Sequence, residues 1–326
     1  MTDPARPGAG VRLATGVGSL RLASPVMTAS GTAGHGAELA AYLDLSRLGA
    51  VVVKSLAAFP WRGNPAPRLA PVRGGMLNSV GLQGPGVAAW VETELPTLAA
   101  TGASVVASIW GRTVAEFAAA AGALAGVDRC VVAVEVNVSC PNLEDRRRMF
   151  AHSPTATAEA VEAAGASGLP RWAKLSPNVA DIAEIAGAAL GAGAEAVTLV
   201  NTLLAMAIDV ETRTFVLGAG GGGLSGAALH PVAVRAVHDC RAAHPTAAIV
   251  GAGGVATGRD AAELLLAGAS AVQVGTATLV DPRAPLRVLE ELEALCVATG
   301  VSDVAELVGA AHRTRPLEDG AAGRRT

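Results

Sequence analysis

The sequence has few aromatic residues, few cysteines and no long uninterrupted hydrophobic segment. Only 3% of its 326 residues are Phe, Trp or Tyr, whereas glycine occurs 39 times, a composition that predicts many tight turns and closely packed helices. No stretch of about 20 apolar residues is free of glycine and charge, so we expect no membrane-spanning helix. The N-terminal segment lacks the apolar centre of a signal peptide, and we therefore expect a cytoplasmic protein.

The cysteines and the charges exclude further classes of protein. The cysteines form no CxxC pair, which argues against a disulfide framework and against a zinc or iron–sulfur site within this chain, so we expect no metal. The net charge of −3 and the pI of about 6.1 provide no general attraction to nucleic acid. The hydrophobic content of 51% is nevertheless ample for a large core.

Strand-like and helix-like segments alternate along the chain, with eight of each, which is the count of a (β/α)8 barrel. A doubly wound open sheet alternates in the same way but rarely needs eight near-equal units. The predicted strands are 25–29, 50–56, 104–110, 131–139, 171–175, 196–201, 247–252 and 271–276. The predicted helices are 37–48, 86–99, 113–125, 155–167, 180–191, 230–243, 258–267 and 283–299.

We expect these segments to form one α/β barrel domain over residues 1–326, with its core at about 11–312. An alternating stretch at 208–217 predicts a small inserted hairpin. A further helix over 302–312 is expected outside the barrel, and the polar tail 313–326 is expected to be flexible.

One stretch, Asn137-Val-Ser-Cys-Pro-Asn142, follows the β-branched run 131–136, which is typical of a buried parallel strand. Pro141 ends the strand, so Asn137, Cys140 and Asn142 stand where a strand meets a polar loop. Carboxamides suit a flat polar ring, and a thiolate beside them could remove a proton. The competing interpretation is that Cys140 is a small buried hydrophobic residue, as free cysteines commonly are.

Polar residues also follow the other predicted strands, and in a barrel all these exits lie at one rim. Lys54 and Lys174 each follow an apolar strand, which should direct them into the barrel mouth rather than into solvent. The last two strands end in glycine-rich loops, where backbone amides near helix starts can hold a phosphate group. Tight turns alone are the alternative explanation for those glycines.

The segment Gly218-Ala-Gly-Gly-Gly-Gly223 matches G-x-G-x-x-G but is not interpreted as a dinucleotide fingerprint. The residues before it form the predicted hairpin rather than a βαβ entry strand, so a flexible loop is expected there. Ser225 and Gly226, which precede a predicted helix, are better candidates for anion binding.

Several motifs together resemble the dihydroorotate dehydrogenase family over about residues 11–312. They are the Asn137–Asn142 stretch, Asn78-Ser-Val-Gly-Leu-Gln83, Arg62-Gly-Asn-Pro-Ala-Pro-Arg68, Gly222-Gly-Leu-Ser-Gly226 and Gly251-Ala-Gly-Gly254. The resemblance implies an FMN-binding TIM barrel that oxidises (S)-dihydroorotate to orotate in de novo pyrimidine biosynthesis. A cysteine at 140 resembles class 1, and the Asn78–Gln83 and Arg62–Arg68 motifs resemble the 1B catalytic subunit. That subgroup implies a homodimer paired with an FAD/iron–sulfur electron-transfer subunit.

The resemblance also implies a role for each matching residue. Cys140 would be the base that deprotonates substrate C5 while hydride leaves C6 for flavin N5, and Lys54 would contact flavin and substrate. The implied cofactor-binding residues are Ala29, Ser30, Lys54, Ser55, Ser108, Asn137, Lys174, Val200, Ser225, Gly226, Gly253, Gly254, Gly275 and Thr276. The implied substrate-binding residues are Lys54, Asn78, Ser79, Val80, Gly81, Leu82, Asn137, Asn142, Asn201 and Thr202.

Three features depart from the family pattern. Ser108 replaces an expected asparagine, the bulky Trp110 follows it, and the loop 143–150 carries Arg146–Arg148 in place of glycines. These differences leave open a flavin oxidoreductase of another dihydropyrimidine such as dihydrouracil, and a flavin-binding barrel without catalysis. A tRNA dihydrouridine synthase is disfavoured because no basic patch is present.

Overall fold

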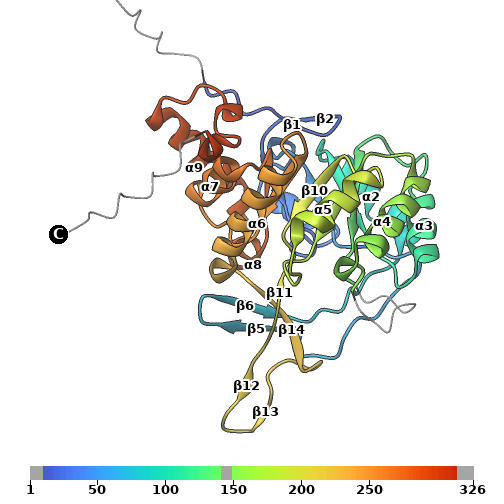
Figure 1. The fold of residues 1–326 in the computed structure, drawn as a ribbon. Helices are drawn as coiled ribbons and strands as arrows, with labels where there is room; N and C mark the ends of the chain where they lie inside the picture. The colour runs from blue at the N-terminus through green and yellow to red at the C-terminus, as the bar shows by residue number, and fades with distance from the viewer. Residues whose placement is uncertain (1–9, 141–148, 314–326) are drawn as a thin grey trace, which may run out of the picture.

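Eight parallel strands form a closed ring at the centre of the computed structural model, which describes residues 10–140 and 149–313 (Figure 1). Their hydrogen-bonded order is β3-β16-β15-β10-β9-β8-β7-β4, and Gly49 N donates to Val26 O at 2.8 Å where the two end strands meet. The predicted (β/α)8 barrel is therefore confirmed. The strands are β3 (Val26–Thr28), β4 (Val51–Val52), β7 (Val105–Ile109), β8 (Val131–Asn137), β9 (Arg171–Leu175), β10 (Ala196–Leu199), β15 (Ala248–Ala252) and β16 (Ala271–Val274).

Helices surround this ring at seven of the eight predicted places, and the short helix at 276–280 was not predicted. They are α1 (Val87–Thr93), α2 (Leu95–Ala99), α3 (Val114–Gly122), α4 (Pro154–Ala163), α5 (Ile182–Gly191), α6 (His230–Ala243), α7 (Gly258–Ala267), α8 (Thr276–Val280) and α9 (Ala284–Thr299). Thr257 shows how the sequence starts one of them, because its side chain and that of Asp260 form a capping box at α7. Within the described residues, no helix is long and apolar enough to cross a bilayer.

Two predicted helices differ from the structure. Residues 37–48 form two short 3-10 segments, η1 (Ala37–Ala41) and η2 (Leu45–Arg47), because Asp44 accepts a hydrogen bond from Ser46 N and starts a new turn. The single helix expected over 302–312 is wrong. That stretch contains η6 (Val304–Glu306) and η7 (Ala310–His312), and Gly309 between them has a φ of 67°, which a continuous helix does not permit.

The interior of the barrel is layered. Met27, Val52, Val106 and Trp172 pack in one buried apolar cluster, which the β1 (Thr15–Val17) and β2 (Leu20–Leu22) hairpin covers through Val17 and Leu22. Strand residues two positions apart face the same side, so the residues after this layer also point inward. On β8, β9, β10 and β16 those next residues are polar and buried: Glu135, Lys174, Thr198 and Gln273. The half of the barrel interior next to the β1–β2 hairpin is therefore an apolar plug, and the polar groups lie on its other side, toward the carboxyl ends of the strands.

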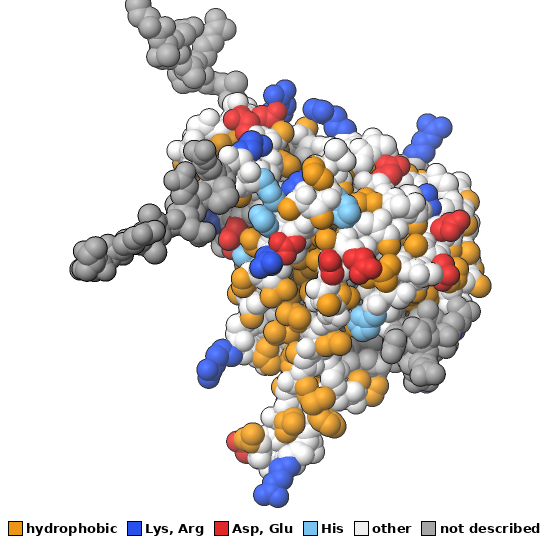
Figure 2. Space-filling view, viewed as in Figure 1, with side chains coloured by type: hydrophobic (Ala, Val, Ile, Leu, Met, Phe, Trp, Pro, Cys, Tyr) orange, Lys and Arg blue, Asp and Glu red, His pale blue; other side chains and the backbone are white. Residues whose placement is uncertain are grey.

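A second, antiparallel sheet projects from the barrel rim (Figure 1). Its order is β11 (Leu203–Met206), β14 (Gly221–Ser225), β6 (Gly75–Asn78) and β5 (Leu69–Val72), and the predicted hairpin is present beyond it as β12 (Ile208–Asp209) and β13 (Thr214–Phe215). Exposed hydrophobic side chains gather on this projection (Figure 2): Leu204, Met206, Ile208, Val210 and Phe215.

The flexible loop expected over residues 218–223 is wrong, because Gly221–Ser225 is strand β14. Its glycines permit close approach to neighbouring chains. A Cβ atom at Gly222 would lie 2.3 Å from Asn78 O, and one at Gly223 would lie 2.0 Å from Thr202 Oγ1. The glycine run therefore serves tight sheet packing, a requirement that depends on residues far away in the sequence.

Close packing of α7 against α9 gives a stability prediction. A Cβ at Gly258 would lie 2.4 Å from Leu292 N and 2.5 Å from Glu291 C, both backbone atoms. We expect Gly258→Ala to lower the free energy of unfolding by about 1–3 kcal/mol, measured by urea denaturation. Gly122→Ala is the matched control, because its Cβ would meet only Ala166 Cβ at 4.0 Å and alanine favours the helix. Equal losses in both variants would contradict this account.

Candidate active site

A cavity of about 710 Å³ lies between the carboxyl ends of the barrel strands and the projecting sheet. This volume is within the range of small-molecule sites, and the position is that of active sites in barrels of this kind. Most residues singled out from the sequence line it: Ala29, Ser30, Lys54, Ser55, Asn78, Ser79, Val80, Gly81, Leu82, Asn137, Lys174, Val200, Asn201, Thr202, Ser225, Gly226, Gly253, Gly254, Gly275 and Thr276. Ser108 and Cys140 are not among the lining residues, and Asn142 lies outside the described residues.

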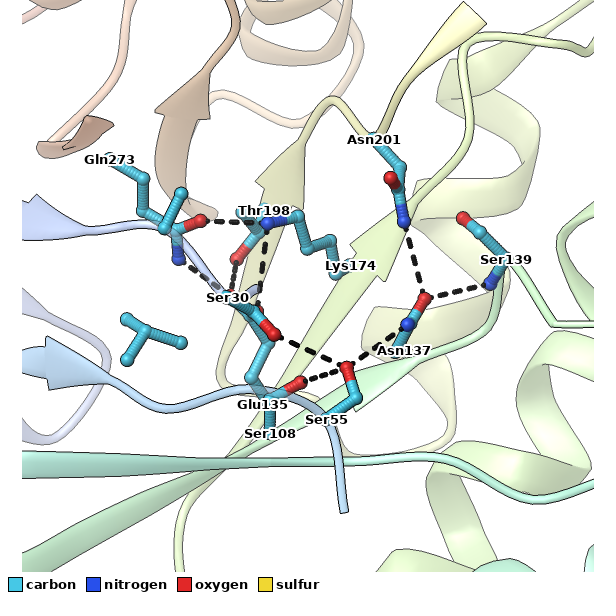
Figure 3. Close-up of polar contacts among 12 residues, drawn as sticks. Ser30, Ser55, Ser108, Glu135, Asn137, Ser139, Lys174, Thr198, Asn201 and Gln273 are labelled. Carbon is cyan, nitrogen blue, oxygen red and sulfur yellow. Dashed lines mark hydrogen bonds and ion pairs between the residues drawn. The ribbon is translucent and has the colours of Figure 1, made fainter. Parts of the chain in front are cut away.

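A chain of hydroxyl and amide groups crosses one wall of the cavity (Figure 3). Ser55 Oγ lies 2.8 Å from Ser108 Oγ and 3.2 Å from Ser30 Oγ, and it accepts from Asn137 Nδ2 at 3.1 Å. Asn201 Nδ2 donates to Asn137 Oδ1 at 3.3 Å. Ser108 thus acts from behind the wall, where it fixes Ser55, and the amides of Asn137 and Asn201 are held beside the cavity.

Two lysines supply positive charge to the cavity. Lys174 is only 6% exposed, and its Nζ donates to Gln273 Oε1 at 2.9 Å and lies 3.8 Å from Glu135 Oε1. Burial lowers the pKa of Lys54, and nearby Arg68 lowers it further. Both effects penalise the ammonium form of Lys54. A negatively charged ligand beside Lys54 would act in the opposite direction and favour the protonated lysine, which would in turn stabilise the ligand.

Cys140 has a buried side chain in this structure. Its Sγ donates to the carbonyl oxygens of Gly111 at 3.0 Å and Asn137 at 3.2 Å. Burial raises the pKa of the Cys140 thiol to about 12. Two acceptors at the sulfur favour the thiol over the thiolate, so the described arrangement keeps Cys140 protonated at neutral pH.

Glycine-containing loops converge at the other end of the cavity. Gly226, Gly253 and Gly254 have φ values of 94°, 141° and 69°, and a Cβ at Gly254 would lie 2.6 Å from His230 Cβ. The Nδ1 atom of His230 donates to Gly253 O at 2.8 Å, since a carbonyl can only accept. The side chains of Ser225 and Thr276 are joined by a hydrogen bond of 2.7 Å. Such a glycine-lined concavity with two hydroxyl groups fits a phosphate group.

Aromatic side chains cluster beside the cavity, and two of them, Trp61 and Trp110, line it. Phe59, Trp61 and Trp110 contact one another edge to face, with ring centroids 5.9–6.1 Å apart. The guanidinium of Arg112 lies 4.6 Å from the Phe59 ring centroid and 5.1 Å from that of Trp61. The sequence drew attention to Trp110 alone. The contact between Trp61 and Arg112 joins two loops that are far apart in the sequence, so no local pattern predicts it.

Several other polar residues line the cavity although the sequence had assigned them no role, among them Asn64, Ser139, Ser176, Asn178 and Gln273. Ser139 Oγ is buried and has no hydrogen-bond partner among residues 10–140 and 149–313, so it is available to a ligand. For Gln273 and for Glu135 beneath the cavity, a usable signal was present. Each is a single polar residue within an apolar strand, which predicts a buried polar interaction.

Comparisons with known proteins point to one family. The family model described as dihydroorotate dehydrogenase matches residues 12–296. A relative from Desulforudis audaxviator, named dihydroorotate dehydrogenase B (NAD(+)), catalytic subunit, is 51% identical over 305 residues, which cover 93% of this chain and 99% of the relative. A relative of the same name from Alkaliphilus oremlandii is 44% identical over 294 residues, covering 90% and 96%.

A solved structure shares the fold. The crystal structure of DHODH in complex with ferulenol from Eimeria tenella has a TM-score of 0.74 and covers 96% of this chain and 91% of its own. The sequence identity is 22%, so this likeness supports the barrel architecture alone.

Proposed function

Because the chain belongs to the dihydroorotate dehydrogenase family and its relatives are class 1B catalytic subunits, we propose that it oxidises (S)-dihydroorotate to orotate with FMN. One observation carries the proposal. A single cavity brings together residues that the family resemblance assigns to flavin ring, flavin phosphate and substrate, although they come from widely separated strand ends. This reaction would place the protein in cytoplasmic pyrimidine biosynthesis, acting as a single barrel domain.

The residues present fit FMN. The glycine-lined end of the cavity, with the hydroxyl groups of Ser225 and Thr276, would hold the phosphate, and a side chain at Gly254 would clash with His230. Lys174 would lie at the N1–C2 end of the ring, and Ser30 and Ser55 would bind its polar edge. When bound, FMN would supply the hydride acceptor, while the protein positions the substrate and excludes water.

The substrate would bind among the amide groups of the cavity. Asn137 and Asn201 already contact each other at 3.3 Å, and Asn78 Nδ2 donates to Gly223 O at 3.2 Å, so these groups are oriented before a ligand arrives. Amides match the imide-like edge of the pyrimidine because each offers both a donor and an acceptor. Lys54 would pair with the substrate carboxylate.

Cys140 is proposed as the base that takes the C5 proton. Its neighbours in the chain, Ser139 and Asn137, line the cavity, so the sulfur needs only a local rearrangement to reach a ligand. That rearrangement would release Sγ from the carbonyl oxygens of Gly111 and Asn137, which now disfavour the thiolate.

Other subunits would accept the electrons. The relatives are named as catalytic subunits. We propose that this chain forms a homodimer and pairs with an FAD/iron–sulfur electron-transfer subunit. The exposed apolar side chains of β11 and the β12–β13 hairpin support a subunit contact at the projecting sheet (Figure 2).

The test is anaerobic mixing of the purified protein with dihydroorotate. We expect the protein to release FMN on denaturation and its flavin absorbance to bleach within seconds to minutes of mixing. Bleaching by dihydrouracil but not by dihydroorotate would replace the proposed substrate. Bound FMN that responds to neither compound would indicate a flavin-binding barrel without this catalysis.

A further inference from the structure

Glu135 is a buried carboxylate that none of the steps above uses. It is 0% exposed and lies on β8, in the polar layer just above the apolar plug of the barrel. Its Oε2 atom accepts from Gln273 Nε2 at 2.6 Å and from Thr198 Oγ1 at 3.0 Å (Figure 3). Its Oε1 atom has no hydrogen-bond partner among the described residues and lies 3.8 Å from Lys174 Nζ.

The groups around Glu135 suit a negative charge. Gln273 Nε2 and Thr198 Oγ1 donate to it, and the nearest charged group is the ammonium of Lys174. Gln273 also accepts from Lys174 Nζ at 2.9 Å, so its amide is fixed between the two charges and cannot turn without losing a contact. Glu135 and Lys174 therefore form one buried unit whose net charge is zero.

Lys174 is not saturated by this unit. Among residues 10–140 and 149–313, its Nζ makes one hydrogen bond, to Gln273, and its distance of 3.8 Å from Glu135 exceeds a normal N–H···O bond. Lys174 also lines the cavity, so its remaining N–H groups can serve a ligand there. A ligand beside Lys174 would experience a weaker positive electrostatic potential than an isolated ammonium creates, because the Glu135 carboxylate behind Lys174 neutralises part of its charge.

We propose that Glu135 is a positioning residue that holds Lys174 and sets the reduction potential of the bound flavin, an inference that rests on the proposed function. Reduction of a flavin adds negative charge at the N1–C2 end of its ring, the end that Lys174 would contact under the proposed function. An isolated ammonium would stabilise that charge strongly, whereas the Glu135 carboxylate offsets part of the effect in this low-dielectric interior. Glu135 thereby keeps the potential low enough for the flavin to pass its electrons onward.

The test is an anaerobic titration of the flavin in Glu135→Gln against reference dyes. Removing the carboxylate while keeping the shape leaves Lys174 with uncompensated charge. We expect the equilibrium constant for flavin reduction to increase at least tenfold, a rise of about 30 mV for a two-electron couple. Thr198→Val is the matched control, because it removes one donor to Glu135 without changing the charge, and its shift should stay below about threefold.

The remaining outcomes are equally decisive. Glu135→Asp keeps the charge but moves it away from Lys174, so it should raise the reduction potential by a smaller amount than Glu135→Gln. If Glu135→Gln loses its flavin, the potential of Glu135→Asp tests the proposal instead. An unchanged potential in the Glu135 variants, or an equal shift in Thr198→Val, would overturn the proposal. Dihydroorotate takes no part in the titration, so a wild-type flavin that dihydroorotate fails to bleach refutes the proposed substrate alone.

Discussion

Replacing Cys140 with alanine is expected to slow the bleaching of the flavin by dihydroorotate about 10²–10⁴-fold while leaving the flavin bound. The reason is that the proposed base is lost, whereas the residues that line the cavity are untouched, since Cys140 is not one of them. Stopped-flow absorbance under anaerobic conditions measures the rate, and the flavin released on denaturation measures retention.

The pH dependence of the same rate provides a second measurement. Burial raises the pKa of the Cys140 thiol to about 12, so the thiolate is a small fraction at neutral pH and grows about tenfold for each pH unit. The rate should therefore rise between about pH 7 and pH 9 in the parental protein and not in Cys140→Ala.

A matched control uses another cysteine whose thiol pKa is also raised. Burial also raises the pKa of Cys130 to about 12, but Cys130 does not line the cavity, so Cys130→Ala should bleach at the parental rate. A parental rate of bleaching in Cys140→Ala would show that another group removes the proton.

The barrel was predictable because its signals are local. The run 131–136 is mostly apolar and β-branched, and it became strand β8 at the expected place. The segment 171–175 also became a strand, β9, as its position in the alternation of strands and helices predicted. The projecting sheet was not predictable beyond its hairpin. Asn78 pairs with Gly223, far away in the sequence, and the glycines of β14 carry no strand propensity of their own.

The sequence predicted which residues line the site better than it predicted the directions of their side chains. Strand exits identified the cavity residues because parallel strands place their carboxyl ends together. The direction of the Cys140 side chain depends on where β7 ends and presents the Gly111 carbonyl, which no local pattern encodes. Glu135 was overlooked although a lone charge within an apolar strand is visible in the sequence.

Replacing Lys174 with methionine is expected to lower the free energy of unfolding of the flavin-free protein by about 3–5 kcal/mol. The cause is the partner left behind. Glu135 is fully buried, and without Lys174 its carboxylate keeps two hydrogen bonds but no ion-pair partner within the part of the chain that the structure describes. Urea denaturation of the flavin-free chain measures the loss without a contribution from ligand binding.

The double variant Lys174→Met/Glu135→Gln separates lost charge compensation from lost packing. It removes both charges of the pair, so we expect it to recover more than half of the stability that Lys174→Met loses. An exposed pair provides the comparison: Arg235 and Asp239 form an ion pair on the surface of α6, and Arg235→Met should cost no more than about 1 kcal/mol. If the double variant is no more stable than Lys174→Met, the cost comes from packing, and Glu135 does not depend on Lys174 for its burial.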